Sequence, residues 1–133
     1  MLIALRILNA LILLMCVAQV VGFLADPAEA TAGLGMALLD GVGASTQLGD
    51  ISAFFLAAGT MVAWGQRRGQ SHVLMAPALM FGAAALMRSL VAMAGHAPFA
   101  PEFIFPEIVM TVVLVASARM RGDEAPNEGQ VAA

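Results

Sequence analysis

Three ionisable residues, Asp50, Arg88 and Glu107, lie inside apolar stretches that are long enough to enter a lipid bilayer. A charged side chain is costly to place in hydrocarbon, so such residues usually pair with one another or mark a functional site. One arginine cannot neutralise two carboxylates. The surplus carboxyl is therefore available to bind a proton, a cation or an amine.

The composition predicts a membrane protein. Of the 133 residues, 61% are hydrophobic and 11% are charged, whereas soluble domains are about 45–50% apolar and ~25% charged. Spans of ~20 residues leave room for about four helices. We expect an all-α, integral membrane, four-helix antiparallel bundle in a single domain, residues 1–121. Its four spans cover about residues 2–24, 47–64, 73–95 and 103–118.

Both ends of the chain need a separate interpretation. Ala28-Glu29-Ala30 has the small-x-small form of a signal-peptide cleavage site. The apolar run before it is longer than the ~7–15 residues of a signal core, so we expect the first span to be retained. Residues 122–133 are polar and acidic, which is typical of a disordered tail.

The arginines predict the orientation of the spans. Apart from Arg88, they lie near the start of span one, between spans two and three, and after span four; the two remaining loops contain no Arg or Lys. Positive loops stay in the cytoplasm, so both termini are predicted to be cytoplasmic. The alanine-rich sequence, which contains no lysine, favours a GC-rich genome and therefore a multi-pass protein of a bacterial cytoplasmic (inner) membrane.

The first outer loop permits two interpretations. Asp26 before Pro27 is a favourable helix start, and Leu34, Leu38 and Leu39 follow at helical spacing. A short interfacial helix over residues 27–39, ended by the glycines that follow, is one interpretation. A flexible glycine-rich loop is the other.

Helical rise places four polar side chains at similar depths below the outer surface. Asp50, Glu107 and Arg88 come to roughly 5, 6 and 10 Å, and Gln19 on span one to about 7–8 Å. Small residues surround Arg88 and Asp50 at helical spacing, which leaves room for the arginine or for a ligand. We expect the four side chains to face one another, with His96 at the outer end of span three as a further candidate.

The cluster has a structural and a functional interpretation. Asp50, Arg88 and Glu107 could form a buried ion network that only fixes helix packing, or they could line a binding site. His96 could relay protons or simply be solvated. No ligand spacing predicts a metal, so no metal and no cofactor are expected. No nucleophile elbow, phosphate loop or Cys-x-x-Cys occurs, and an enzyme is not favoured.

The order of these residues resembles a known group. An acid opens span two (Asp50), Gly82 to Arg88 and then Gly95-His96-Ala97-Pro98 lie in and after span three, and Glu107 lies early in span four. The pattern, with Asp26-Pro27 after span one, is similar to an uncharacterised bacterial family of small four-helix integral membrane proteins, a domain of unknown function distantly DoxX-like. The resemblance implies the fold and no established activity.

Two functional hypotheses follow. In the first, the outer polar cluster binds a small amphipathic ligand, a lipid head group or a proton. In the second, the protein is a non-catalytic accessory or structural subunit that docks a membrane protein partner. The lipid bilayer is a partner in both. Nucleic acid is not expected, because the chain has no basic stripe.

A small multidrug-type exporter is disfavoured because span one has Cys16 and Val17 where that class carries a glutamate.

Overall fold

The computed structural model describes residues 1–122, and every regular element in that range is a helix. In chain order the elements are α1 (Leu2–Ala25), α2 (Pro27–Gly33), α3 (Gly41–Gly65), the 3-10 helix η1 (Ser71–Leu74), α4 (Met75–Met93) and α5 (Pro101–Gly122). Four helices are long and apolar enough to cross a membrane: α1, α3, η1 continued by α4, and α5. By helix length and composition, this is a multi-pass membrane protein.

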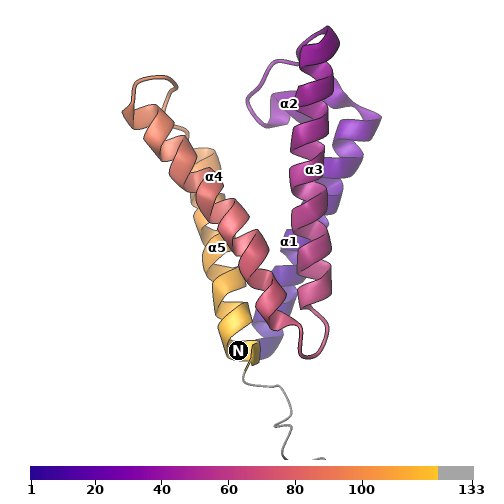
Figure 1. Cartoon of the computed structure of the whole chain (residues 1–133), viewed down its shortest axis with the longest axis vertical. Coiled ribbons are helices and arrows are strands. Elements are labelled where there is room, and N and C mark those ends of the chain that lie inside the picture. The colour runs from indigo at the N-terminus through magenta and orange to yellow at the C-terminus, as the bar shows by residue number, and fades with distance from the viewer. Residues whose placement is uncertain (123–133) are drawn as a thin grey trace, which may run out of the picture.

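The four long helices form two antiparallel hairpins, one of α1 with α3 and one of α4 with α5 (Figure 1). The hairpins meet at the end that carries the N-terminus, the α3–η1 connection and the end of α5, which we call the base. They diverge toward the end that carries α2 and the α4–α5 connection, which we call the open end (Figure 1). The expected antiparallel order is present, but the helices do not pack together along their whole length.

An apolar cluster joins the hairpins from the base to the middle of the helices. Its buried members are Ile12, Cys16, Ala58, Val62, Leu74, Ala78, Phe81, Leu114 and Ala118. At its upper edge the ring of Phe54 on α3 meets that of Phe81 on α4 edge to face, with centroids 5.6 Å apart. Aromatic pairs favour this arrangement. Beyond this contact the two hairpins separate.

Buried polar contacts add to the cluster at the base. Asn9 of α1 and Ser117 of α5 are both fully buried, and Asn9 Nδ2 donates to Ser117 Oγ over 2.9 Å. Arg121 donates from Nη1 to Gln66 Oε1 and from Nη2 to the Gln66 carbonyl, and Gln66 Nε2 in turn donates to the Arg6 carbonyl. Polar side chains that bond between helices orient them within an apolar environment. These bonds tie α1 and α5 to each other and to Gln66, the residue that follows α3.

The first connection at the open end is partly helical. Asp26 caps α2, because its Oδ1 accepts from the Glu29 backbone N–H over 3.0 Å, as its position before Pro27 predicts. The helix ends at Gly33 rather than near Leu39, since Gly35 adopts a positive φ of 72° that turns the chain. The following segment is held by Gln47, whose side chain bonds to the backbone of Leu39 and Ala37.

Several predicted span boundaries shift. The second span was predicted to begin near residue 47, but α3 begins at Gly41, after Asp40 in an extended conformation. Pro77 lies in the first turn of α4, where a helix tolerates a residue without an N–H. Gly122 belongs to α5, although the sequence places it in the tail. The rest of that predicted tail, residues 123–133, lies outside the described residues.

The close contact of Gly65 with η1 yields a stability prediction. A Cβ at Gly65 would overlap the fully buried side chain of Leu74, whereas one at Gly49 would meet nothing within 4 Å. We expect Gly65→Ala to lower the unfolding free energy by about 1–3 kcal/mol through overpacking. Gly49→Ala, in the same helix, should leave it equal or higher, because alanine favours the helical state. Thermal unfolding of both variants in detergent measures the difference, and equal melting temperatures would contradict the packing at η1.

The Asn9 contact yields a second prediction. Ser117→Ala removes the acceptor of a buried amide and should lower the unfolding free energy by about 1–3 kcal/mol. Ser45→Ala, at an exposed position of α3, is the control and should have little effect. A destabilisation no larger for Ser117→Ala than for Ser45→Ala would rule out the bond as a contributor to the base.

Candidate functional site

Two of the predicted site residues meet in the α4–α5 hairpin. Arg88 of α4 donates from Nε to Glu107 Oε1 of α5 over 2.9 Å. Both lie in the half of the hairpin toward the open end, Arg88 five residues before the end of α4 and Glu107 six residues after the start of α5. Antiparallel packing of neighbouring helices brings these two positions to the same level. Of the cluster expected from the sequence, the structure brings Arg88 and Glu107 together as an ion pair.

The two partners differ in their exposure. The Glu107 side chain is 12% exposed, and its Oε2 is buried and accepts no hydrogen bond from residues 1–122. The Arg88 side chain is 42% exposed, and within the same range its only hydrogen bond is the one from Nε. Charged hydrogen bonds at this distance are strong and directional. Glu107 therefore holds the inner edge of the guanidinium and leaves the two Nη groups available.

The guanidinium also lies on an aromatic ring. Arg88 Cζ is 5.2 Å from the centroid of Phe103, which is four residues before Glu107 on α5. An arginine within about 6 Å of a ring centroid is attracted by the π face. Phe103 also lies near the segment after α2, because a Cβ at Gly35 would be 3.5 Å from the ring. The ring is thus close both to the arginine and to the first connection of the other hairpin.

A pocket of about 410 Å³ opens beside Arg88. Apart from the guanidinium its lining is apolar and comes from α4 and the α4–α5 connection: Ala84, Met87, Arg88, Val91, Ala97, Pro98 and Ala100. Ala84 is one of the small residues that helical spacing placed beside Arg88. A concave apolar surface with one placed polar group is the usual form of a small-molecule site.

Asp50 does not join the pair. Because α3 begins at Gly41, Asp50 lies nine residues into the helix, or about 13–14 Å from its start. Its side chain is exposed and makes no hydrogen bond or ion pair with any residue from 1 to 122. The expected network of Asp50, Arg88 and Glu107 is thus a pair plus a separate acid. The cause is the divergence of the two hairpins, which sequence spacing does not reveal.

Gln19 and His96 are also outside the pair. Gln19 is half-buried on α1, in the other hairpin, and His96 is exposed in the connection after α4. The His96 backbone N–H bonds to the Val91 carbonyl over 3.1 Å, which closes the end of α4. Within the described part of the chain, no three His, Cys, Asp or Glu residues lie close enough to hold a metal ion. A role for either residue in ligand binding stays a prediction.

Sequence reasoning missed Phe103 and the Asn9–Ser117 bond. Phe103 is four residues from Glu107, one helical turn away, so its proximity to a partner of that glutamate could have been inferred. Asn9, like Gln19, is a polar residue within the first apolar run, and its presence there indicated a buried polar contact as strongly. Its partner could not have been chosen from sequence, because the contact joins residues 108 positions apart.

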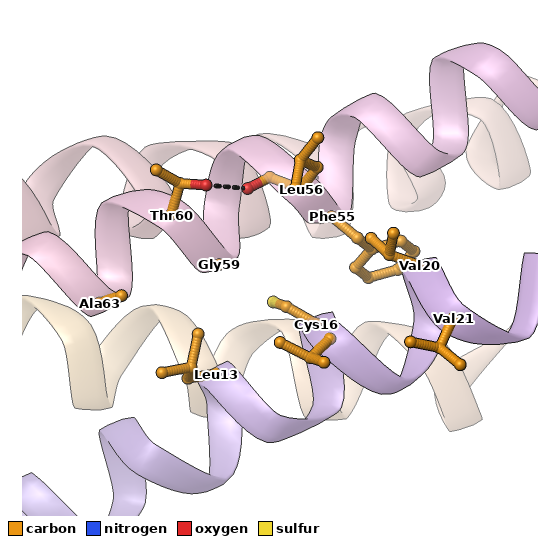
Figure 2. A pocket seen from close by; sticks show the side chains of 10 residues that line it. Leu13, Cys16, Val20, Val21, Phe55, Leu56, Gly59, Thr60 and Ala63 are labelled. Atoms are coloured by element: carbon orange, nitrogen blue, oxygen red, sulfur yellow. Dashed lines mark hydrogen bonds between the residues drawn. The ribbon is translucent and has the colours of Figure 1, made fainter. Parts of the chain in front are cut away.

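A second pocket, of about 340 Å³, lies between α1 and α3 (Figure 2). The two helices approach closely at Gly59, where a Cβ would be only 3.0 Å from the Cys16 Cβ. The lining is apolar except for Thr60, and the Thr60 hydroxyl bonds to the Leu56 carbonyl over 2.7 Å (Figure 2). Because the Thr60 hydroxyl is already bonded, the residues that line this pocket offer no group that would orient a polar ligand.

No protein-family model, curated protein or solved structure matches this chain. The site is therefore interpreted from its own residues.

The asymmetry of the Arg88–Glu107 pair predicts unequal effects of removing each partner. Arg88→Met leaves a buried carboxylate without a donor and should lower the unfolding free energy by about 1–3 kcal/mol. Glu107→Gln keeps an acceptor for Nε and leaves Arg88 half-exposed to solvent or head groups, so its effect should be smaller. The apolar pair Arg88→Met with Glu107→Leu should regain most of the loss. A melting temperature for Arg88→Met equal to that of wild type would mean that Glu107 carries no uncompensated charge.

Proposed function

We propose that this protein binds the polar end of a small amphipathic molecule or lipid head group at Arg88, with the apolar part of the ligand in the adjacent pocket. The observation that carries the proposal is the half-exposed guanidinium at the edge of a pocket that is otherwise apolar. Of the five guanidinium N–H donors, the one on Nε is engaged by Glu107. The four on the two Nη groups suit an anionic oxygen such as that of a phosphate or carboxylate.

Glu107 and Phe103 have supporting roles in this proposal. The bond from Nε and the ring beneath Cζ fix the plane of the guanidinium, which lowers the ordering cost of ligand binding. Glu107 Oε2 is buried without a donor among residues 1–122, so the contact of this carboxylate with Arg88 is made through Oε1. No nucleophile or general base is paired for chemistry here, so the proposal is a binding protein and not an enzyme.

The proposed site faces the outer side of the membrane. The base carries five arginines near the helix ends: Arg6, Arg67, Arg68, Arg119 and Arg121. The positive-inside rule assigns such an end to the cytoplasm and the open end to the opposite side. The resemblance to small bacterial four-helix proteins, distantly DoxX-like, supports a bacterial cytoplasmic membrane as the location.

Binding of a single-chain probe tests the proposal. Dodecyl phosphate, added to wild-type protein in dodecyl maltoside, should raise the melting temperature by several degrees, because a ligand at about 100 times its Kd stabilises by roughly 2.7 kcal/mol. Arg88→Gln should abolish the shift. Arg119→Gln, an exposed arginine near the end of α5, is the matched control and should keep it.

The alternative function, an accessory subunit in which the pair only fixes packing, predicts a different result. In that case dodecyl phosphate would shift wild type and Arg88→Gln equally or shift neither. Either outcome would reject the binding site and favour docking of a membrane protein partner through the lipid-facing surface.

A further inference from the structure

The pocket between α1 and α3, which we call the α1–α3 groove, is open on the surface of the first hairpin. Its lining comes from α1 and α3 alone (Figure 2). Its rim is about half exposed at Val17, Val21 and Leu56, whereas Cys16 and Gly59 in its floor are buried. Exposed apolar surface of a membrane-spanning hairpin contacts lipid chains, which are as apolar as leucine. The groove therefore suits a hydrocarbon chain, and it offers no group that would bind a polar head.

The lower end of the α1–α3 groove lies at the base, beside exposed arginines. Arg6 is seven residues before Leu13, which lines the groove, so the two share one face of α1. Gln66, the residue after α3, donates from Nε2 to the Arg6 carbonyl over 3.3 Å. That bond places the turn of α1 that carries Arg6 next to the connection in which Arg67 and Arg68 follow Gln66. The groove thus leads from the apolar middle of the hairpin to a group of exposed guanidinium side chains.

The distance from these arginines to the floor of the groove matches one lipid leaflet. Cys16 is ten residues beyond Arg6 on α1, or about 15 Å along the helix axis, and the hydrocarbon core of a bilayer is about 30 Å thick. A lipid whose phosphate lies at the arginines would end its acyl chains near the contact of Cys16 with Gly59. Trp64, in the last turn of α3, is 51% exposed, and tryptophan is enriched at membrane interfaces. Its position supports an interfacial level for the base.

The distribution of charge makes an anionic head group the complement of this end of the groove. The base carries the five arginines near the helix ends. The acids among residues 1–122 all lie toward the open end: Asp26, Glu29, Asp40, Asp50, Glu102 and Glu107. Basic side chains at a membrane surface attract anionic lipids. Among lipids that could insert a chain into the groove, those with a negative head group are therefore favoured.

We propose that the α1–α3 groove binds an anionic phospholipid of the leaflet at the base, with its phosphate at Arg6, Arg67 and Arg68 and one acyl chain between the two helices. The site is independent of the one at Arg88, which lies toward the open end of the other hairpin. A second copy of the chain fits the groove less well. Two copies related by a twofold axis along the membrane normal would bring their arginines to the same leaflet, and like charges oppose association.

The fluorescence of Trp64, the only tryptophan in the chain, tests the proposal, because Trp64 follows Ala63 of the groove lining and lies at the opposite end from Arg88. The full chain is placed in phosphatidylcholine vesicles, and phosphatidylglycerol or phosphatidylcholine brominated midway along its acyl chains is added as the quencher. Wild type should prefer phosphatidylglycerol. Arg67→Gln should lower this preference about fivefold, as expected for one basic side chain near a membrane surface. Arg119→Gln, at an exposed position of α5, is the control and should change it less than about twofold, because distant exposed charges are screened.

A second pair of variants tests the groove itself. Ala63→Leu fills its lower end and should abolish the preference, whereas Ala53→Leu, at an exposed position of α3 outside the lining, should keep it. If Ala63→Leu proves too unstable to reconstitute, Thr60→Leu, also exposed and in the lining, takes its place. An unchanged preference in the filled variant would mean that the lipid binds the charged surface alone, and the proposal would be overturned. Absence of the preference in wild type would overturn it too, and a cross-linked dimer that Ala63→Leu prevents would then assign the groove to a second copy.

Discussion

The buried contacts at the base are the constraint on which the rest of the structure depends. The apolar cluster from Ile12 to Ala118 and the Asn9–Ser117 bond join the two hairpins over less than the full length of their helices. Interhelical hydrogen bonds and close packing drive helix association in membranes, because lipid supplies no hydrophobic force between helices. Beyond the ring pair of Phe54 and Phe81 the helices of the two hairpins diverge (Figure 1), although Phe103 still approaches the other hairpin at Gly35. The separation of Asp50 from the Arg88–Glu107 pair follows from that divergence.

Inside the α4–α5 hairpin, the same packing rules produce a site. Thr111 donates from its hydroxyl to the Glu107 carbonyl and to that of Ala78, so the two helices are tied one turn below the ion pair. This places Glu107 against α4, where its Oε1 accepts from Arg88 Nε. The guanidinium ends between a carboxylate, a ring and an apolar pocket. The carboxylate matches the charge of the guanidinium, and the ring and the pocket are apolar. The N–H donors on the two Nη atoms are therefore the polar feature of the site.

Much of the fold could be predicted from the sequence, because it depends on local signals. Four apolar runs, the Asp26 cap and the alternation of arginine-rich and arginine-free connections are each readable within about 25 residues. The pairing of Arg88 with Glu107 could also be predicted, since a short connection forces their helices to be antiparallel neighbours. The separation of Asp50 could not, because it depends on how far two hairpins stay in contact. The early start of α3 was missed because Gly41 and Gly43 indicate a break in the helix. The side chain of Gln47, further along α3, bonds to the backbone of Ala37 and Leu39 and so holds the segment before the helix.

Cys16 gives the structure a practical property. It is the only cysteine in the chain, and it is 1% exposed where α1 meets α3 at Gly59. A thiol in that position is shielded from reagents in the aqueous phase, so the native chain is close to a cysteine-free background for site-directed labelling. Pairs of spin labels on the open-end turns of α3 and α4 would report the separation of the hairpins directly. The separation could then be followed in detergent, in bilayers and during exchange between them.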